Sequence, residues 1–266
     1  MGQGSRISRY AEPFAGGAGA ALRLLVDEFV DEIVINDLDK GIAAFWRSIL
    51  NQSDEFLARL RTCPLTVIEW RRQQSIYQSR SGNDLDLGFA TFYLNRTNRS
   101  GILTARPIGG LDQRGKWKID ARFNRGELAE RITRIARYRD RITVEERDGL
   151  DFLRDHLSDN GCLFYVDPPY LTKGGDLYLD TLSWDDHVSL AKLLKPSKVG
   201  WMLTYDADPR VFTDLYPNTR VASFGIAHTA AKQLVGVEYA VFGNSLKLPD
   251  LALLGSNAMA VAGLAS

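Results

Sequence analysis

Four consecutive residues, Asp167-Pro168-Pro169-Tyr170, have the chemistry to bind a flat nitrogenous base. They follow an apolar run, 162–166, that predicts a buried strand because it is short and rich in β-formers. Proline cannot continue a sheet ladder, so the chain should turn at the carboxyl edge of the sheet. There Asp167 and the Pro168 carbonyl can accept both N–H bonds of an exocyclic amine, while Tyr170 stacks on the ring. The alternative is a strand-end turn without chemistry.

A glycine-rich turn near the start of the chain is the second candidate site. It lies between a predicted strand and an apolar, helix-forming stretch, 20–29. Glycines in such a turn let the backbone approach a nucleoside cofactor closely, although the spacing is not that of the dinucleotide fingerprint. The candidate cofactor-binding residues are Glu12, Pro13, Phe14, Ala15, Gly16, Gly17 and Gly19.

Acidic residues follow two further predicted strands, 32–35 and 142–146. An acid at the end of the second strand of such a sheet can accept hydrogen bonds from ribose hydroxyls, and we favour Asp37 for this role. Asp37 or Asp39 could instead cap the helix that follows. Asp148 can accept a bond from the adenine amine of a cofactor, or it can cap the next helix; the two readings are equally supported.

The order of these motifs resembles one family. Residues 12–19 followed by 167–170 look like the S-adenosylmethionine-dependent DNA adenine-N6 methyltransferases of the Dam-like, alpha arrangement. In that group the cofactor motif comes first, the target-recognition segment next and the catalytic motif last. Residues 93–102 are similar to the family's Tyr-Leu-Asn-Arg element, and 117–124 to the segment that follows it. The resemblance extends over nearly the whole chain, from Arg9 to Leu248.

The resemblance implies an α/β, Rossmann-like methyltransferase fold with a mostly parallel sheet and a helical target-recognition insertion. Residues 1–52 and 140–250 would form the catalytic domain, 53–139 the insertion and 251–266 a C-terminal tail. The expected activity is site-specific methylation of adenine N6 in double-stranded DNA, with S-adenosyl-L-methionine as cofactor and no metal. A cognate restriction endonuclease is an expected partner. Residues 171–181, rich in Gly and Asp, are expected to form a loop over the site.

Enzymes that methylate other amino groups could use the same hydrogen-bond acceptors. Cytosine-N4 enzymes more often have Ser in the first position of the tetrapeptide and protein-amide enzymes have Asn, so Asp167 favours adenine. RNA methylation is a further alternative. Family members usually carry a Gly-Lys element well before the glycine turn, where this chain has only Met1 to Arg9. Either the methionine end of the cofactor is held differently or cofactor affinity is reduced, and a catalytically impaired DNA-binding remnant is the remaining alternative.

A basic segment lies within the predicted insertion. Residues 94–125 contain eight basic and two acidic side chains, a net charge of +6 in a chain whose overall charge is zero. Such a local excess, interleaved with polar and aromatic residues, suits contact with phosphates and base edges. The alternative is an ordinary solvated surface. The candidate DNA-binding residues are Arg96, Asn98, Arg99, Lys116, Lys118 and Arg122.

Composition sets the remaining expectations. With 266 residues, 45% of them hydrophobic, the chain can form one large domain, or one domain with an insertion. Cys63 and Cys162 lie far apart and are expected to be reduced thiols of a cytoplasmic protein. Three histidines without a Cys/His cluster predict no zinc site. No segment predicts a membrane span, and the sequence does not indicate an oligomeric state.

Overall fold

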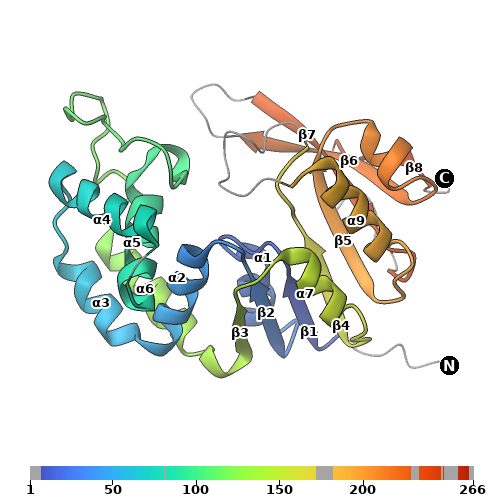
Figure 1. Ribbon diagram of the computed structural model, residues 1–266, viewed down its shortest axis with the longest axis horizontal. Helices are drawn as coiled ribbons and strands as arrows, with labels where there is room; N and C mark the ends of the chain where they lie inside the picture. The colour runs from blue at the N-terminus through green and yellow to red at the C-terminus, as the bar shows by residue number, and fades with distance from the viewer. Residues whose placement is uncertain are drawn as a thin grey trace. The chain divides into compact units, whose positions relative to one another are not determined.

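A computed structural model gives the structure of the chain, and Figure 1 shows its helices and strands. It describes residues 7–80, 82–171, 182–228, 234–246, 248 and 257–263. The chain divides into two compact units, a sheet unit formed by Met1–Asn36 with Arg147–Ser266 and a helical unit formed by Asp37–Glu146. The predicted loop over the site lies, except for Leu171, outside the described residues.

The sheet unit has a parallel half in which strands and helices alternate. Its strands pair in parallel in the order β2-β1-β4-β5, so their carboxyl ends meet at one edge of the sheet. Ser183 caps the helix before β5 through a capping box with Asp186. The elements are β1 (Arg9–Glu12), α1 (Gly19–Val26), β2 (Glu32–Asn36), α7 (Gly149–His156), β4 (Cys162–Val166), α9 (Trp184–Leu194) and β5 (Gly200–Asp206).

The other half of this sheet is antiparallel and continues in the order β5-β7-β6-β8. A five-residue π-helical segment, Val211–Leu215, precedes it. The strands are β6 (Arg220–His228), β7 (Leu234–Phe242) and β8 (Met259–Ala262). Part of the predicted C-terminal tail is therefore an edge strand, because Met259–Ala262 pairs with β6.

The two faces of the sheet carry different side chains, because successive residues of a strand point to opposite sides. On one face Phe164 of β4 and Trp201 of β5 pack with Phe152 of α7 and Leu190 of α9, all buried in one core. Figure 1 shows these two helices beside β4 and β5. Glu12 lies on the opposite face, where its carboxylate meets the first turn of α1. That opposite face, at the carboxyl edge, is where the candidate site is built.

The helical unit is built around α5, most of whose residues are buried. Phe45, Phe56, Phe89, Phe92 and Phe123 pack their rings at centroid distances of 5.3–6.1 Å. Such edge and stacked contacts hold α2, α3 and α5 together with the segment before α6. The elements are α2 (Lys40–Asn51), α3 (Ser53–Thr62), α4 (Val67–Ser79), α5 (Asp84–Thr97), η1 (Arg99–Gly101), α6 (Arg125–Ala136), η2 (Arg139–Arg141) and β3 (Ile142–Glu145).

The observed unit boundaries fall outside the predicted insertion, 53–139, on both sides. On the N-terminal side the reason is α2, which packs closely on α5. A side chain at Gly88 would lie 2.5 Å from the carbonyl oxygen of Ala44, so this contact requires a residue without Cβ. Residues 37–52, predicted as part of the catalytic domain, therefore belong to the helical unit.

Candidate active site

A row of polar side chains crosses one face of the sheet at its carboxyl edge. Asp167 directly follows β4, and the pairing of Val166 with Leu203 places it beside Thr204 of β5. Tyr165, two residues before Asp167, lies on the same face, as does Glu12 on the neighbouring strand β1. The sheet therefore brings a carboxylate, two hydroxyl groups and a second carboxylate together from three strands.

The Asp167 carboxyl group is held on one side and open on the other. The Thr204 hydroxyl donates a 2.6 Å hydrogen bond to Asp167 Oδ1, and the Tyr165 hydroxyl lies 3.1 Å from Thr204 Oγ1. Asp167 itself is exposed, although the protein around its carboxyl group desolvates it. Burial raises the pKa of Asp167 to about 6; the Thr204 bond lowers it and the charge of Glu238 raises it.

Two buried acids hold the last residue of the tetrapeptide and the residue that follows it. The Tyr170 hydroxyl donates a 2.6 Å bond to Glu238 Oε1, and the Leu171 amide donates a 3.1 Å bond to Asp206 Oδ1. Asp206 and Glu238 are directly opposite each other on β5 and β7. Asp206, Glu238 and Thr204 were not predicted as site residues, because only the pairing of β5 with β4 and β7 brings them to the tetrapeptide.

The bond between Tyr170 and Glu238 gives a first prediction. We expect Glu238→Leu and Tyr170→Phe each to lower kcat/KM by roughly 10-fold, because a hydrogen bond to a charged group that fixes the ring is lost. Since both changes break one bond, the double variant should lose little more than either single variant, whereas Glu238→Gln keeps an acceptor and most activity. Steady-state methylation of a duplex gives these values in a double-mutant cycle. Fully additive losses would contradict the assignment.

The glycine turn after β1 has room on its outer side. A Cβ added at Gly17 or Gly19 would meet no atom within 4 Å, so these positions can accept a close ligand. Gly16 has φ +47°, which favours glycine. The Phe14 ring packs on the backbone of Gly149, where a Cβ would lie 2.4 Å from the ring. This contact joins the turn to the start of α7.

Asn36, a fully buried residue at the end of β2, fastens the same region. Its Nδ2 donates bonds of 2.8 Å to the Pro13 carbonyl and 3.0 Å to the Arg147 carbonyl, and its Oδ1 accepts the Arg147 amide at 3.2 Å. The Ala15 amide bonds to the Asn36 carbonyl at 2.8 Å. Asn36 therefore sets the path of the turn, a role that was not predicted because its partners are distant in sequence.

The acids proposed for the cofactor have partners within their own units. Asp148 caps α7 through Oδ1, which accepts the Leu150 amide at 2.8 Å, so the capping reading is correct. Asp39 caps α2 and pairs with Arg80, while Asp37 Oδ1 accepts the Asp39 amide at 2.9 Å. One of the two acids caps the helix, as expected. The cofactor contacts of Asp37 and Asp148 stay predictions.

Glu12 is buried at the end of β1, and its Oε1 accepts the amide of Ala21 in α1 at 3.0 Å. Burial raises the pKa of Glu12 to about 7; the bonds from Ala21 and Tyr10 lower it, and the charge of Asp167 raises it. An incoming positive charge would relieve the repulsion between Glu12 and Asp167. The site is therefore suited to a cationic ligand.

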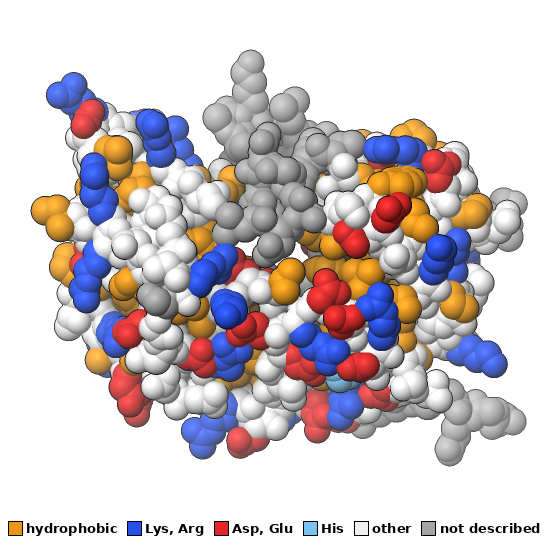
Figure 2. All heavy atoms as spheres, in the orientation of Figure 1, with side chains coloured by type: hydrophobic (Ala, Val, Ile, Leu, Met, Phe, Trp, Pro, Cys, Tyr) orange, Lys and Arg blue, Asp and Glu red, His pale blue; other side chains and the backbone are white. Residues whose placement is uncertain are grey.

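The predicted DNA-binding residues lie in the helical unit and differ in exposure. Arg99, Lys116 and Lys118 are exposed, whereas Arg96 and Arg122 are half-buried. Figure 2 shows basic side chains along the upper part of this unit. Burial lowers the pKa of Arg96, and the charges of Arg122 and Arg131 lower it further. These three cations lie close enough to repel one another, which favours binding of an anion.

Asn98 has a different role from the predicted DNA contact. It is fully buried, and its Oδ1 accepts the indole N–H of Trp70 at 2.6 Å. Its Nδ2 donates to the carbonyls of Ile102 and Leu103 at 2.9 and 3.0 Å. Because these bonds use both of its N–H donors, Asn98 stabilises the loop after α5, and its contact with DNA stays a prediction.

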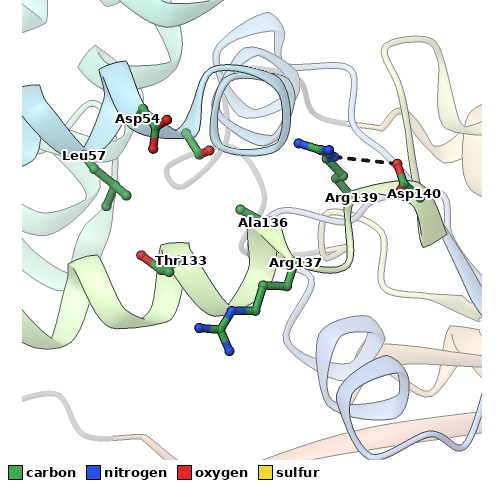
Figure 3. Close-up of a pocket in the computed structure, with 8 residues that line it drawn as sticks. Asp54, Leu57, Thr133, Ala136, Arg137, Arg139 and Asp140 are labelled. Atoms are coloured by element: carbon green, nitrogen blue, oxygen red, sulfur yellow. Dashed lines mark ion pairs between the residues drawn. The ribbon is translucent and has the colours of Figure 1, made fainter.

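A shallow pocket of about 380 Å³ lies in the helical unit, as Figure 3 shows. The residues that line it are Ser53, Asp54, Leu57, Thr133, Ala136, Arg137, Arg139 and Asp140. None of them is a predicted site residue. Within the described part of the chain, no three His, Cys, Asp or Glu side chains gather as metal ligands. None of the helices described is long and apolar enough to cross a membrane.

A glycine turn after the first strand and an Asp-Pro-Pro-Tyr turn after β4, on a sheet with a parallel and an antiparallel half, define a Rossmann-like methyltransferase. The chain belongs to the D12 class N6 adenine-specific DNA methyltransferase family, whose model matches residues 3–232. It is 23% identical over 199 residues to the Type II methyltransferase M.CviBI of Paramecium bursaria Chlorella virus NC1A. The matched region covers 73% of this chain and 71% of that relative. The activity is therefore adenine-N6 methylation of DNA, and the cytosine-N4 and RNA alternatives are not supported.

Proposed function

We propose that this chain takes the methyl group from S-adenosyl-L-methionine and transfers it to adenine N6 at specific sites in double-stranded DNA, with Asp167, Pro168, Pro169 and Tyr170 as the catalytic residues. The observation that carries the proposal is the Asp167 carboxyl group. Asp167 is exposed at the carboxyl edge of the sheet, and Thr204 fixes one of its carboxyl oxygens, while the other oxygen accepts no hydrogen bond from a described side chain.

The adenine amine is a poor nucleophile because its lone pair is delocalised into the ring. Asp167 and the Pro168 carbonyl accept its two N–H bonds and so localise the lone pair on the nitrogen. This is positioning and electrostatic preorganisation. The nitrogen would form a bond to the methyl carbon as the bond between that carbon and the cofactor's sulfur breaks, so that the sulfur leaves as a neutral thioether. The nitrogen loses one proton, which the ionised Asp167 is placed to accept.

The target base must leave the duplex to reach this site, which costs on the order of a few kcal/mol. Stacking on the Tyr170 ring offsets about 1–3 kcal/mol of that cost. Glu238 supports this role, because it holds the Tyr170 hydroxyl at 2.6 Å and so limits the rotation of the ring.

The glycine turn and the acids beside it fit the cofactor. S-Adenosyl-L-methionine would supply an activated methyl group on a positively charged sulfur. The open space at Gly17 and Gly19 leaves room at the turn, and the negative charges of Glu12 and Asp167 complement a sulfonium. Asp37 and Asp148 are the proposed partners of the ribose and of the cofactor's adenine amine.

The helical unit, 37–146, is proposed as the target-recognition insertion. Arg96 and Arg122, together with Arg131 of α6, offer adjacent cations to a phosphate. Exposed Lys118 donates to the Gln113 carbonyl, and Lys116 lies 5.7 Å from the ring centroid of the exposed Trp117. These contacts keep both lysines near one loop, where they can meet the DNA backbone.

Salt dependence separates the two kinds of DNA contact. We expect Lys116→Ala and Lys118→Ala each to reduce the slope of log affinity against log salt by roughly one unit, because each removes one phosphate contact. At least one arginine change among Arg96, Arg99 and Arg122 should instead broaden the recognised site, since the arginine fork matches guanine. Affinity at several salt concentrations on cognate and scrambled duplexes measures both. Unchanged binding by all five variants would make this segment an ordinary solvated surface.

The direct test of the function is methylation of a random-sequence duplex followed by modification-aware sequencing. We expect N6-methyladenine within one short recognised sequence. Calorimetric titration with S-adenosylmethionine tests the cofactor separately, and no binding there would favour the DNA-binding remnant. Because the relative from the virus is named a Type II methyltransferase, we propose a cognate restriction endonuclease as partner. The two free, buried cysteines fit the proposed cytoplasmic location.

A further inference from the structure

The Thr204 hydroxyl has one hydrogen and lies between two partners. It is 2.6 Å from Asp167 Oδ1 and 3.1 Å from the Tyr165 hydroxyl, and Thr204 itself is buried. An ionised carboxylate has no hydrogen to offer, so Thr204 donates to Asp167. Its oxygen must then accept the hydrogen of Tyr165. The two hydrogen bonds therefore run in one direction: Tyr165 donates to Thr204, and Thr204 donates to Asp167.

These hydrogen bonds make the two carboxylate oxygens of Asp167 different. Oδ1 accepts the Thr204 hydroxyl, while Oδ2 accepts no hydrogen bond from a side chain in the part of the protein that the structure describes. A single 2.6 Å bond near the end of a short side chain also restricts its rotation. Asp167 therefore presents one defined oxygen to the site, which a free aspartate at the end of a strand would not do.

We propose that Thr204 is a positioning residue for methyl transfer: it fixes the Asp167 carboxylate so that Oδ2 receives the substrate amine, and Tyr165 orients the Thr204 hydroxyl. The inference rests on the proposed role of Asp167. Thr204 touches neither the substrate nor the reacting atoms in this proposal and acts only through Asp167.

The same bond affects the ionisation of Asp167. Burial and the charge of Glu238 raise the pKa of Asp167, whereas the Thr204 bond lowers it. The other titratable groups that face Asp167 are Tyr10 and Glu12 of β1 and Tyr165 of β4, whose own pKa values are raised in part by its charge. Since a protonated oxygen accepts the amine poorly, activity should fall as the pH drops through the pKa of Asp167. Loss of the Thr204 bond should move that fall to higher pH.

The experiment compares Thr204→Val with Thr204→Ser and with Thr219→Val, which replaces another buried threonine of the same unit. Single-turnover methyl transfer is measured from pH 5 to 9, with near-ultraviolet circular dichroism to check the fold. We expect Thr204→Val to lower the rate at pH 7 by roughly 10- to 100-fold and to move the acid limb upward, because a bond to a charged group is lost. Thr204→Ser should stay within about threefold of the parent, and Thr219→Val should not shift the limb.

Tyr165→Phe is the second variant, and it keeps the test decisive if Thr204→Val does not fold. It should give a smaller loss, about 3- to 10-fold, with an upward shift of the acid limb. If the low-pH side of the rate profile of Thr204→Val lay at the same pH as in the parent, the proposal would be overturned. If Thr204→Val is unfolded, the same result in Tyr165→Phe would overturn it. So would equal losses in the valine and serine variants. An inactive parent would instead refute the proposed function, so the two failures are distinguishable.

Discussion

Replacing Asp167 with alanine or asparagine is expected to lower methyl transfer by at least about 100- to 1,000-fold. The change removes an acceptor from the substrate amine, and it opens no cavity because Asp167 is exposed at the end of β4. Single-turnover transfer from labelled S-adenosylmethionine to duplex DNA measures the loss. Asp185→Ala, which removes an exposed acid from α9, is the matched control and should transfer at the parent rate.

Asp167→Asn should lose activity but should not lose stability. The fold raises the pKa of Asp167 from its usual 3.8 to about 6, so ionising it at neutral pH costs folding free energy. Asp167→Asn should therefore have a Tm equal to or above that of the parent at pH 7. The difference in Tm should shrink as the pH falls from 7 to 4, where the parent carboxyl becomes protonated in the folded state.

For the activity prediction, an Asp167→Ala protein that transferred methyl groups near the parent rate would contradict the catalytic assignment.

Replacing Gly17 with valine is expected to weaken S-adenosylmethionine binding by at least about 10-fold, while DNA binding stays within about twofold. The Cβ at this position points into open space, so the variant should fold, and its side chain should occupy the volume proposed for the cofactor. Calorimetric titration measures the cofactor affinity, and fluorescence anisotropy with a labelled duplex measures the DNA affinity.

Gly126→Val in α6 is the matched control for cofactor binding, because the nearest atom to a Cβ there, Asn124 Oδ1, lies at the ordinary contact distance of 3.6 Å. It should bind S-adenosylmethionine like the parent. If Gly17→Val bound the cofactor as tightly as this control, the cofactor would not lie at the turn. Equal losses of cofactor and DNA binding by Gly17→Val would indicate a general defect in folding.

Local sequence patterns were enough to predict the elements and the chemistry. The apolar run before Asp167 and the two prolines after it gave β4 and the turn, since these signals depend only on near neighbours. The strand predicted at 32–35, which the structure shows as β2, is local in the same way. Together with the order of the motifs, they predicted the methyltransferase fold and the adenine-N6 activity of the family.

Long-range contacts decided what the sequence could not. Asn98 looked like a DNA ligand because it lies among arginines, but burial against Trp70 gives it a structural role. The place of α2 depended on the close approach of Ala44 to Gly88, which are 44 positions apart. Such pairings depend on which helices pack together, and no local pattern records that.

The sequence by itself determined that the Asp167 carboxylate would follow a strand at the carboxyl edge of the sheet, because the two prolines after it cannot continue a sheet ladder. Only the tertiary structure decided how that acid is held. Thr204 reaches Asp167 through the parallel register of β4 and β5, and Glu238 reaches Tyr170 across 68 positions. Sheet register brings distant residues together, so the partners that fix and ionise Asp167 become visible only after the strands have paired.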